Sequence, residues 1–119
     1  MSDILRVSQL NRYVKSRLES DSLLQEVYVS GEIGTLSVNG RSGHIYFTLK
    51  DRNSRLACVM FAGNRRGLDF TMRDGMSIVV IGNVSVYERD GKYQLYAKHI
   101  VLDGAGLLYE RFEQLKRHN

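Results

Sequence analysis

Residues 43–51 read Gly-His-Ile-Tyr-Phe-Thr-Leu-Lys-Asp, and they predict a β-strand with two different faces. Side chains alternate across a strand, so one face is apolar and carries Ile45, Phe47 and Leu49. The opposite face carries polar, aromatic and basic side chains, namely His44, Tyr46, Thr48 and Lys50. The first face can build a core, whereas the second offers a ring for a base and a cation for a phosphate, as single-stranded nucleic acid requires.

Four further stretches have strand character: 27–36, 55–61, 76–87 and 92–102. Gly31 interrupts the first of these and predicts a bulge or a sharp bend. Asp90-Gly91 is a hairpin signal between the last two. Between the third and fourth predicted strands, residues 63–74 hold a short helical turn at most.

Helices are predicted at both ends of the chain. Ser8 is the expected N-cap of a helix that runs to about Glu19, with an apolar stripe formed by Leu10, Tyr13, Val14 and Leu18. A final helix after Gly104 has its own stripe, formed by Leu107, Leu108, Phe112 and Leu115.

This order of elements predicts a mainly β fold: a five-stranded OB-fold barrel with an N-terminal and a C-terminal helix. Closure of the barrel also removes the strand edges that an open sheet would expose. We expect one domain, made of an N-terminal helical segment (1–26), the barrel (27–103) and the C-terminal helix (104–119).

Composition agrees with a globular protein of 119 residues, with 43% hydrophobic and 25% charged residues. The excess of 17 Lys and Arg over 13 Asp and Glu gives a net charge of +4, a mild preference for an acidic partner such as nucleic acid. No apolar run approaches a membrane helix, and no secretory signal is visible. Cys58 is the single cysteine, which fits a reducing cytoplasm.

The candidate nucleic-acid-binding residues are aromatic side chains in strands and cations in or beside loops. The expected base-stacking residues are Tyr46, Phe61, Tyr87 and Tyr96. The expected phosphate contacts are Arg41, Lys50, Arg52, Arg55, Arg65, Arg66, Arg89 and Lys92, with His44 and Thr48 on the same strand face as Tyr46. The alternatives are simple packing for a strand tyrosine, a solvated role for the cations, and a core position for Phe61.

Catalytic and metal-binding patterns are absent from the sequence. The acidic residues Asp51, Asp69, Asp74 and Asp90 fall at predicted turns, where Asp is favoured for backbone reasons. The histidines and Cys58 lack metal-ligand spacing, and Cys58 is expected to pack as a small hydrophobe. We therefore expect no catalytic residue, no metal and no cofactor in this chain.

Several sequence blocks, in order, resemble the N-terminal domain of the exodeoxyribonuclease VII large subunit. They are Val-Ser-Gln-Leu-Asn at 7–11, Val-Ser-Gly-Glu-Ile at 29–33, the stretch 43–51, Val-Met-Phe at 59–61, Val-Ser-Val-Tyr-Glu at 84–88, Gly-Lys-Tyr-Gln-Leu at 91–95 and Phe-Glu-Gln-Leu-Lys at 112–116. The loop at 34–40 departs from this resemblance, because relatives tend to be more basic and polar there.

The resemblance implies an OB-fold that binds single-stranded DNA for a nuclease region following it, so this chain is not expected to cleave DNA by itself. The family's large subunit assembles with several copies of a small subunit. A protein-interaction role is the alternative: the barrel would dock the small subunit or form a homodimer, through the stripe of the first helix or through the final helix.

Overall fold

The alternating stretch at 43–51 forms strand β2 (Ile45–Lys50) in the computed structural model, which describes residues 4–104. Ile45, Phe47 and Leu49 are each 3% exposed, whereas Tyr46 between them is 41% exposed. The prediction of one core face and one outward face is therefore confirmed.

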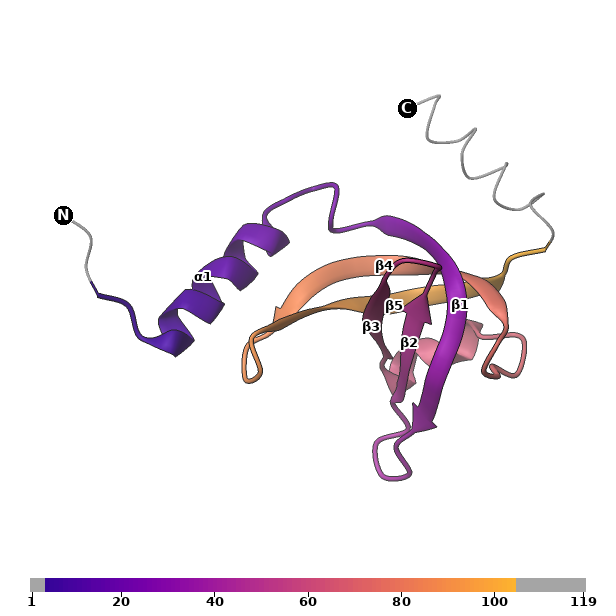
Figure 1. Ribbon diagram of the computed structural model, residues 1–119. Helices are drawn as coiled ribbons and strands as arrows, with labels where there is room; N and C mark the ends of the chain where they lie inside the picture. The colour runs from indigo at the N-terminus through magenta and orange to yellow at the C-terminus, as the bar shows by residue number, and fades with distance from the viewer. Residues whose placement is uncertain (1–3, 105–119) are drawn as a thin grey trace.

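The elements follow the predicted order, with bounds α1 (Val7–Glu19), β1 (Val27–Val38), β2 (Ile45–Lys50), β3 (Arg55–Met60), the 3₁₀ helix η1 (Ala62–Gly67), β4 (Ser77–Tyr87) and β5 (Lys92–Leu102). The strands form a closed barrel in the order β1-β2-β3-β5-β4 (Figure 1). Neighbouring strands are antiparallel except β3 and β5, which pair in parallel through Cys58↔Leu95 and Val59↔Tyr96. The predicted five-stranded OB-fold barrel is confirmed.

The core lies inside the barrel and receives alternate residues of every strand, among them Ile33, Ile45, Phe47, Leu49, Cys58, Met60, Ile78, Val80, Leu95 and Ile100. Cys58 is 1% exposed, and burial raises the pKa of its thiol to about 12. It therefore packs as a small hydrophobe, as the sequence predicts.

Two sequence predictions about the first half of the chain need correction: the predicted N-cap residue is wrong, and of the bulge or bend predicted at Gly31, the bulge is wrong. The first helix begins at Val7, and Arg6 rather than Ser8 occupies the N-cap; the Arg6 backbone N–H donates to Gln9 Oε1 at 2.8 Å. Gly31 pairs regularly with Ile78, and the register of β1 and β2 shifts between Gly34 and Ser37 instead. The predicted final helix after Gly104 lies outside the described residues.

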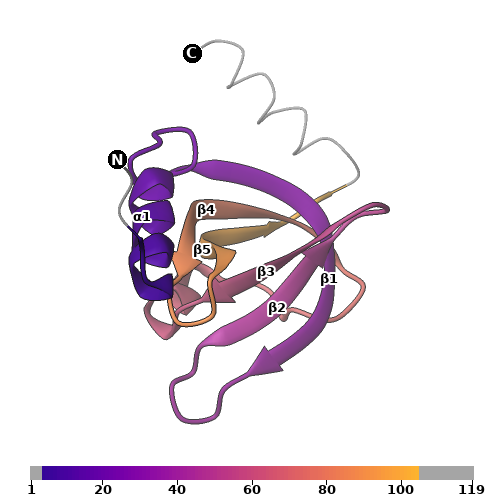
Figure 2. The same ribbon diagram turned by 60° about the vertical axis from the view of Figure 1, so that its left-hand side comes forward.

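Helix α1 lies along the β4–β5 hairpin (Figure 2). Asn11 Nδ2 donates to the Glu88 carbonyl at 2.9 Å, and Lys15 Nζ lies 3.5 Å from Glu88 Oε1. At the other end of the helix, the buried Ser85 hydroxyl donates to Glu19 Oε2 at 2.9 Å. These bonds fix α1 beside the outer surface of β4.

The turns hold the barrel strands in register by local hydrogen bonds. Asp51 accepts from the backbone N–H groups of Asn53 and Ser54, each at 2.8 Å, and these bonds lower the pKa of its carboxyl. Gly91 adopts φ 65°, as the Asp90-Gly91 hairpin turn requires. Asp51 is therefore a turn residue, as predicted.

Candidate nucleic-acid interface

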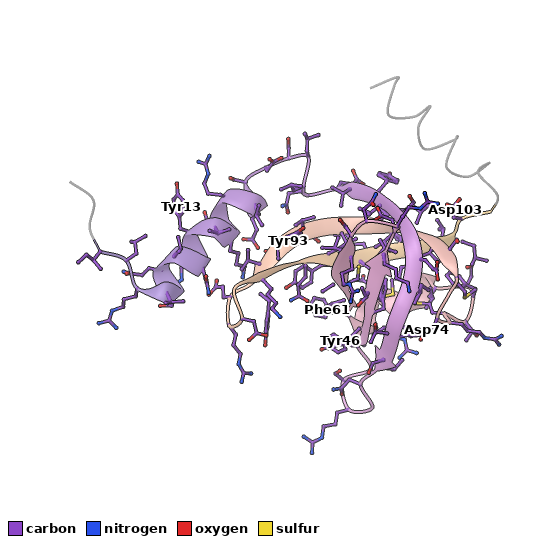
Figure 3. The ribbon with its side chains drawn as sticks, viewed as in Figure 1. Tyr13, Tyr46, Phe61, Asp74, Tyr93 and Asp103 are labelled. Carbon is purple, nitrogen blue, oxygen red and sulfur yellow. The ribbon has the colours of Figure 1, made fainter. Side chains whose placement is uncertain are left out.

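A groove of about 360 Å³ crosses the outer surface of β2, β3 and β5. Its size is in the range of small-ligand sites. All of the predicted base-stacking residues line the groove, namely Tyr46, Phe61, Tyr87 and Tyr96. The predicted phosphate contact Lys92 lines it as well. Figure 3 shows Tyr46 and Phe61 close to each other on one side of the barrel. The fold thus gathers in one place aromatic residues that lie up to fifty positions apart in sequence.

The groove is hollow because small apolar side chains form its floor between the aromatic ones. Tyr46 of β2 pairs across the sheet with Val59 of β3, and Val59 pairs with Tyr96 of β5. Ala57 lies two residues before Val59 on the same strand face and also lines the groove. Tyr46 and Tyr96 are therefore separated by two strand spacings, about 10 Å, with a small apolar floor between them.

Phe61 lies directly after β3, and its side chain points outward. The sequence had left open whether Phe61 lies in the core or on the surface. It is 44% exposed, and Tyr46 and Tyr87 are each 41% exposed, so all three retain ring surface that a base can cover. The Phe61 ring lies 5.7 Å from the Tyr96 ring and meets the His44 ring edge-on at 5.0 Å. These contacts restrict Phe61 before any ligand binds.

His44 supports this arrangement through its ring nitrogen. The Ala62 backbone N–H donates to His44 Nδ1 at 2.9 Å, so this ring nitrogen acts as the acceptor. His44 therefore holds the backbone that follows Phe61 in place. It does not line the groove itself.

Tyr96 is the most enclosed of the aromatic residues in the groove. Burial raises the pKa of its hydroxyl; Lys15 acts in the opposite direction, and Tyr87 and Glu19 add to the rise. Gln94 Nε2 donates to the Tyr96 hydroxyl at 3.4 Å. Tyr96 consequently presents an uncharged phenol at neutral pH, which suits contact with a base.

A second cleft of about 410 Å³ lies farther along β2 and contains three other predicted residues: Thr48, Lys50 and Arg55. Lys50 pairs across the sheet with Arg55 on one side and with Glu32 on the other. Within residues 4–104, no ion pair joins either cation to Glu32 or to Asp74, which also line the cleft. The two cations therefore remain available to a phosphate.

The other predicted cations do not line either hollow. Arg65 Nη1 donates to the Gly43 carbonyl at 3.0 Å and thus ties the β1–β2 loop to η1. The remaining arginines are exposed in loops, turns or η1: Arg41, Arg52, Arg66 and Arg89. Strand alternation therefore predicted which residues line the groove better than nearness to a strand end did.

Sequence reasoning missed the floor residues Ala57 and Val59 and the rim residues Asp90 and Gln94. Alternation would have identified three of them, since Ala57 and Val59 share a face with Phe61, and Gln94 shares a face with Tyr96.

In the described part of the chain, no group of three or more His, Cys, Asp or Glu side chains is arranged to hold a metal ion. No helix in residues 4–104 is long and apolar enough to cross a membrane.

Comparison with known proteins places this geometry in a family. The exodeoxyribonuclease 7 large subunit of Lachnoclostridium phytofermentans is 55% identical over 98% of this chain and 29% of its own length. The same subunit of Brevibacillus brevis is 53% identical over 98% of this chain and 25% of its own length. The chain thus spans between a quarter and a third of the length of these relatives.

Two solved structures share the fold at low sequence identity. One is a replication protein A heterotrimer bound to ssDNA, with TM-score 0.57 and 15% identity over 82% of this chain and 74% of that chain. The other is the S. pombe Stn1-Ten1 complex, with TM-score 0.56 and 16% identity over 79% of this chain and 70% of that chain. A family model described as an OB-fold nucleic acid binding domain matches residues 5–101. The chain belongs to this family of OB-fold nucleic-acid-binding domains, and the resemblance to the exodeoxyribonuclease VII large subunit is confirmed.

Proposed function

We propose that this domain binds single-stranded DNA in the groove over β2, β3 and β5. The observation that carries the proposal is the convergence of Tyr46, Phe61, Tyr87 and Tyr96 around a small apolar floor. An aromatic ring stacks on any base, so such a groove holds single strands of any sequence. The replication protein A heterotrimer, which shares the fold and is bound to ssDNA, supports the same use of the barrel.

Three cations beside the aromatic residues complete the proposed path. Lys92 lines the groove itself, whereas Lys50 and Arg55 line the second cleft on β2. Tyr46 and Lys50 are four residues apart on the same strand face, about 13 Å. A single-stranded DNA whose base stacks on Tyr46 can therefore place a phosphate near Lys50 and Arg55.

We further propose that the domain delivers DNA to a larger enzyme. Its relatives are exodeoxyribonuclease large subunits, and this chain corresponds to less than a third of their length. In this proposal the remainder of such a subunit degrades single-stranded DNA, together with the small subunit, in the cytoplasm. The domain itself contributes no catalytic residue and needs no cofactor.

A titration with a labelled single-stranded oligonucleotide at two salt concentrations tests the proposal. We expect micromolar or tighter affinity that weakens steeply with salt. Each phosphate contact adds about 0.7 to the slope of log K against log salt for single strands, so Lys92→Ala should lower the slope by about that amount. A fluorescence anisotropy series measures both quantities.

Arg17→Ala is the matched control for charge. Arg17 is exposed on α1, two residues from Lys15 and therefore on the opposite side of the helix from the hairpin. This variant should retain the wild-type slope. Absence of binding to single strands at low salt, or tighter binding of a duplex of the same sequence, would contradict the proposal, because paired bases cannot reach the groove floor.

A second candidate function, protein docking, is favoured by the outer surface of α1. Of the predicted apolar stripe, only Leu18 packs against the core, whereas Leu10, Tyr13 and Val14 are exposed by 49%, 60% and 41%. Figure 3 shows Tyr13 directed away from the barrel. Exposed apolar residues grouped on one helix are typical of an interaction surface.

If this surface pairs two copies of the chain, the double variant Leu10→Asp/Tyr13→Asp should convert a dimer into a monomer. Analytical ultracentrifugation at high protein concentration measures the change. A wild-type chain that sediments as a monomer throughout the concentration range would exclude self-association through α1.

A further inference from the structure

A third hollow adjoins the aromatic groove where α1 faces the barrel. It has a volume of about 430 Å³ and lies between α1, η1 and the outer surface of β4 and β5. Phe61 and Tyr96 line both hollows. These two rings therefore form a shared wall. A single strand of DNA that leaves the groove past them enters the space beside α1. We call this space the α1 compartment.

The α1 compartment differs from the groove because it is lined by unpartnered amides. Asn83 of β4 pairs across the sheet with Tyr96, and it is half-buried. Its side chain makes no hydrogen bond to another described residue, and the same holds for the exposed Asn64 of η1, which also lines the compartment. An amide side chain carries both donors and an acceptor, as the edges of bases do.

Asn83 also continues a row of side chains across the sheet. The row runs from Tyr46 of β2 through Val59 of β3 and Tyr96 of β5 to Asn83 of β4. Each step is one strand spacing, about 4.8 Å. The amide therefore lies one step beyond the last aromatic ring, in line with the proposed path of the bases.

The charges of the compartment favour one position for a phosphate. Lys15 lies 3.5 Å from Glu88, and the Glu19 carboxylate accepts from the Ser85 hydroxyl, so both are engaged on the α1 side. Lys98 of β5 is exposed and forms no ion pair with a described residue. A phosphate would thus be drawn to Lys98 and kept away from Glu19 by repulsion.

We propose that the α1 compartment binds one further nucleotide of the single strand, with its base against Asn83 and Asn64 and its phosphate against Lys98. This inference rests on the proposed function and extends it: the nucleic-acid interface continues across β5 to β4, and α1 forms its boundary. Hydrogen bonds to base edges would also give this one position a base preference that stacking alone does not supply.

Affinities for a series of thymidine oligonucleotides that lengthen by one nucleotide test the extension. In the wild type, affinity should rise until the compartment is filled. In the double variant Asn83→Ala/Lys98→Ala it should stop rising one nucleotide earlier, leaving a loss of about threefold to tenfold at full length and none for the shortest oligonucleotides. Thermal unfolding verifies the fold, and Lys98→Ala alone provides a surface variant if the double variant is unstable.

Arg17→Ala, on the far side of α1, should match the wild type at every length. Equal affinities of wild type and double variant at every length would overturn the extension while leaving the proposed function intact. An equal loss at every length would also overturn it, because Asn83 and Lys98 would then act on the groove itself. Absence of wild-type binding would refute both proposals.

Discussion

Phe61→Ala should weaken binding of single-stranded DNA by about tenfold to a hundredfold, because stacking of one base contributes about 1–3 kcal/mol. Phe61 is the aromatic residue for which we expect the largest effect. Its ring contacts those of His44 and Tyr96, and it lines both the groove and the α1 compartment. A base that loses this ring loses a surface that is already held in position.

Phe61→Leu separates stacking from packing, since leucine keeps apolar volume but offers no ring face. It should bind nearly as weakly as Phe61→Ala while remaining closer to the wild type in stability. Tyr93→Ala is the control for loss of an aromatic residue, because Tyr93 is 60% exposed and does not line the groove. Wild-type affinity in a correctly folded Phe61→Ala protein would show that the bases do not stack there.

The largest effect on stability is expected for Gly82→Ala, a loss of about 3 kcal/mol in the free energy of unfolding. Gly82 lies where the register of β4 and β5 shifts, next to Ile81. A Cβ at this position would overlap the backbone carbonyl of Tyr96, which has no flexible side-chain atom to move aside. The strands must separate locally, and the strand that carries Tyr96 moves with them.

Gly63→Ala is the matched control, since a Cβ at Gly63 would meet no atom within 4 Å. Its unfolding free energy should stay within about 1 kcal/mol of the wild type or rise slightly. Urea denaturation followed by circular dichroism measures both variants, because the chain has no tryptophan. Equal midpoints for the two glycine variants would contradict the close approach of β4 and β5 at Gly82.

The sequence predicts the barrel well where the signal is local. The alternation of 43–51 identifies both faces of β2, because a half-buried strand repeats every two residues. The Asp90-Gly91 turn likewise follows from backbone preference alone. The register shift between Gly34 and Ser37 could not be predicted, because it depends on the partner strand.

The candidate site is predictable only in part, for a related reason. Periodicity places Tyr46 and Tyr96 on outward faces, but it does not show that β3 and β5 pair in parallel and bring them to one groove. Nor does it reveal that His44 and Arg65 are bonded to backbone groups of other elements. Likewise, the apolar stripe on α1 identifies the apolar side of the helix, but it does not predict which surface covers that side.

The most direct test of single-stranded DNA binding in the groove is chemical-shift mapping of the ¹⁵N-labelled domain with a short thymidine oligonucleotide. The largest shifts should fall on the outward residues of β2, β3 and β5, centred on Tyr46, Val59 and Tyr96. Residues 27–31 of β1, which pair with β4 and line none of the described hollows, should change little. Shifts centred on that part of β1, or on the outer side of α1 with the groove unchanged, would contradict the proposed interface.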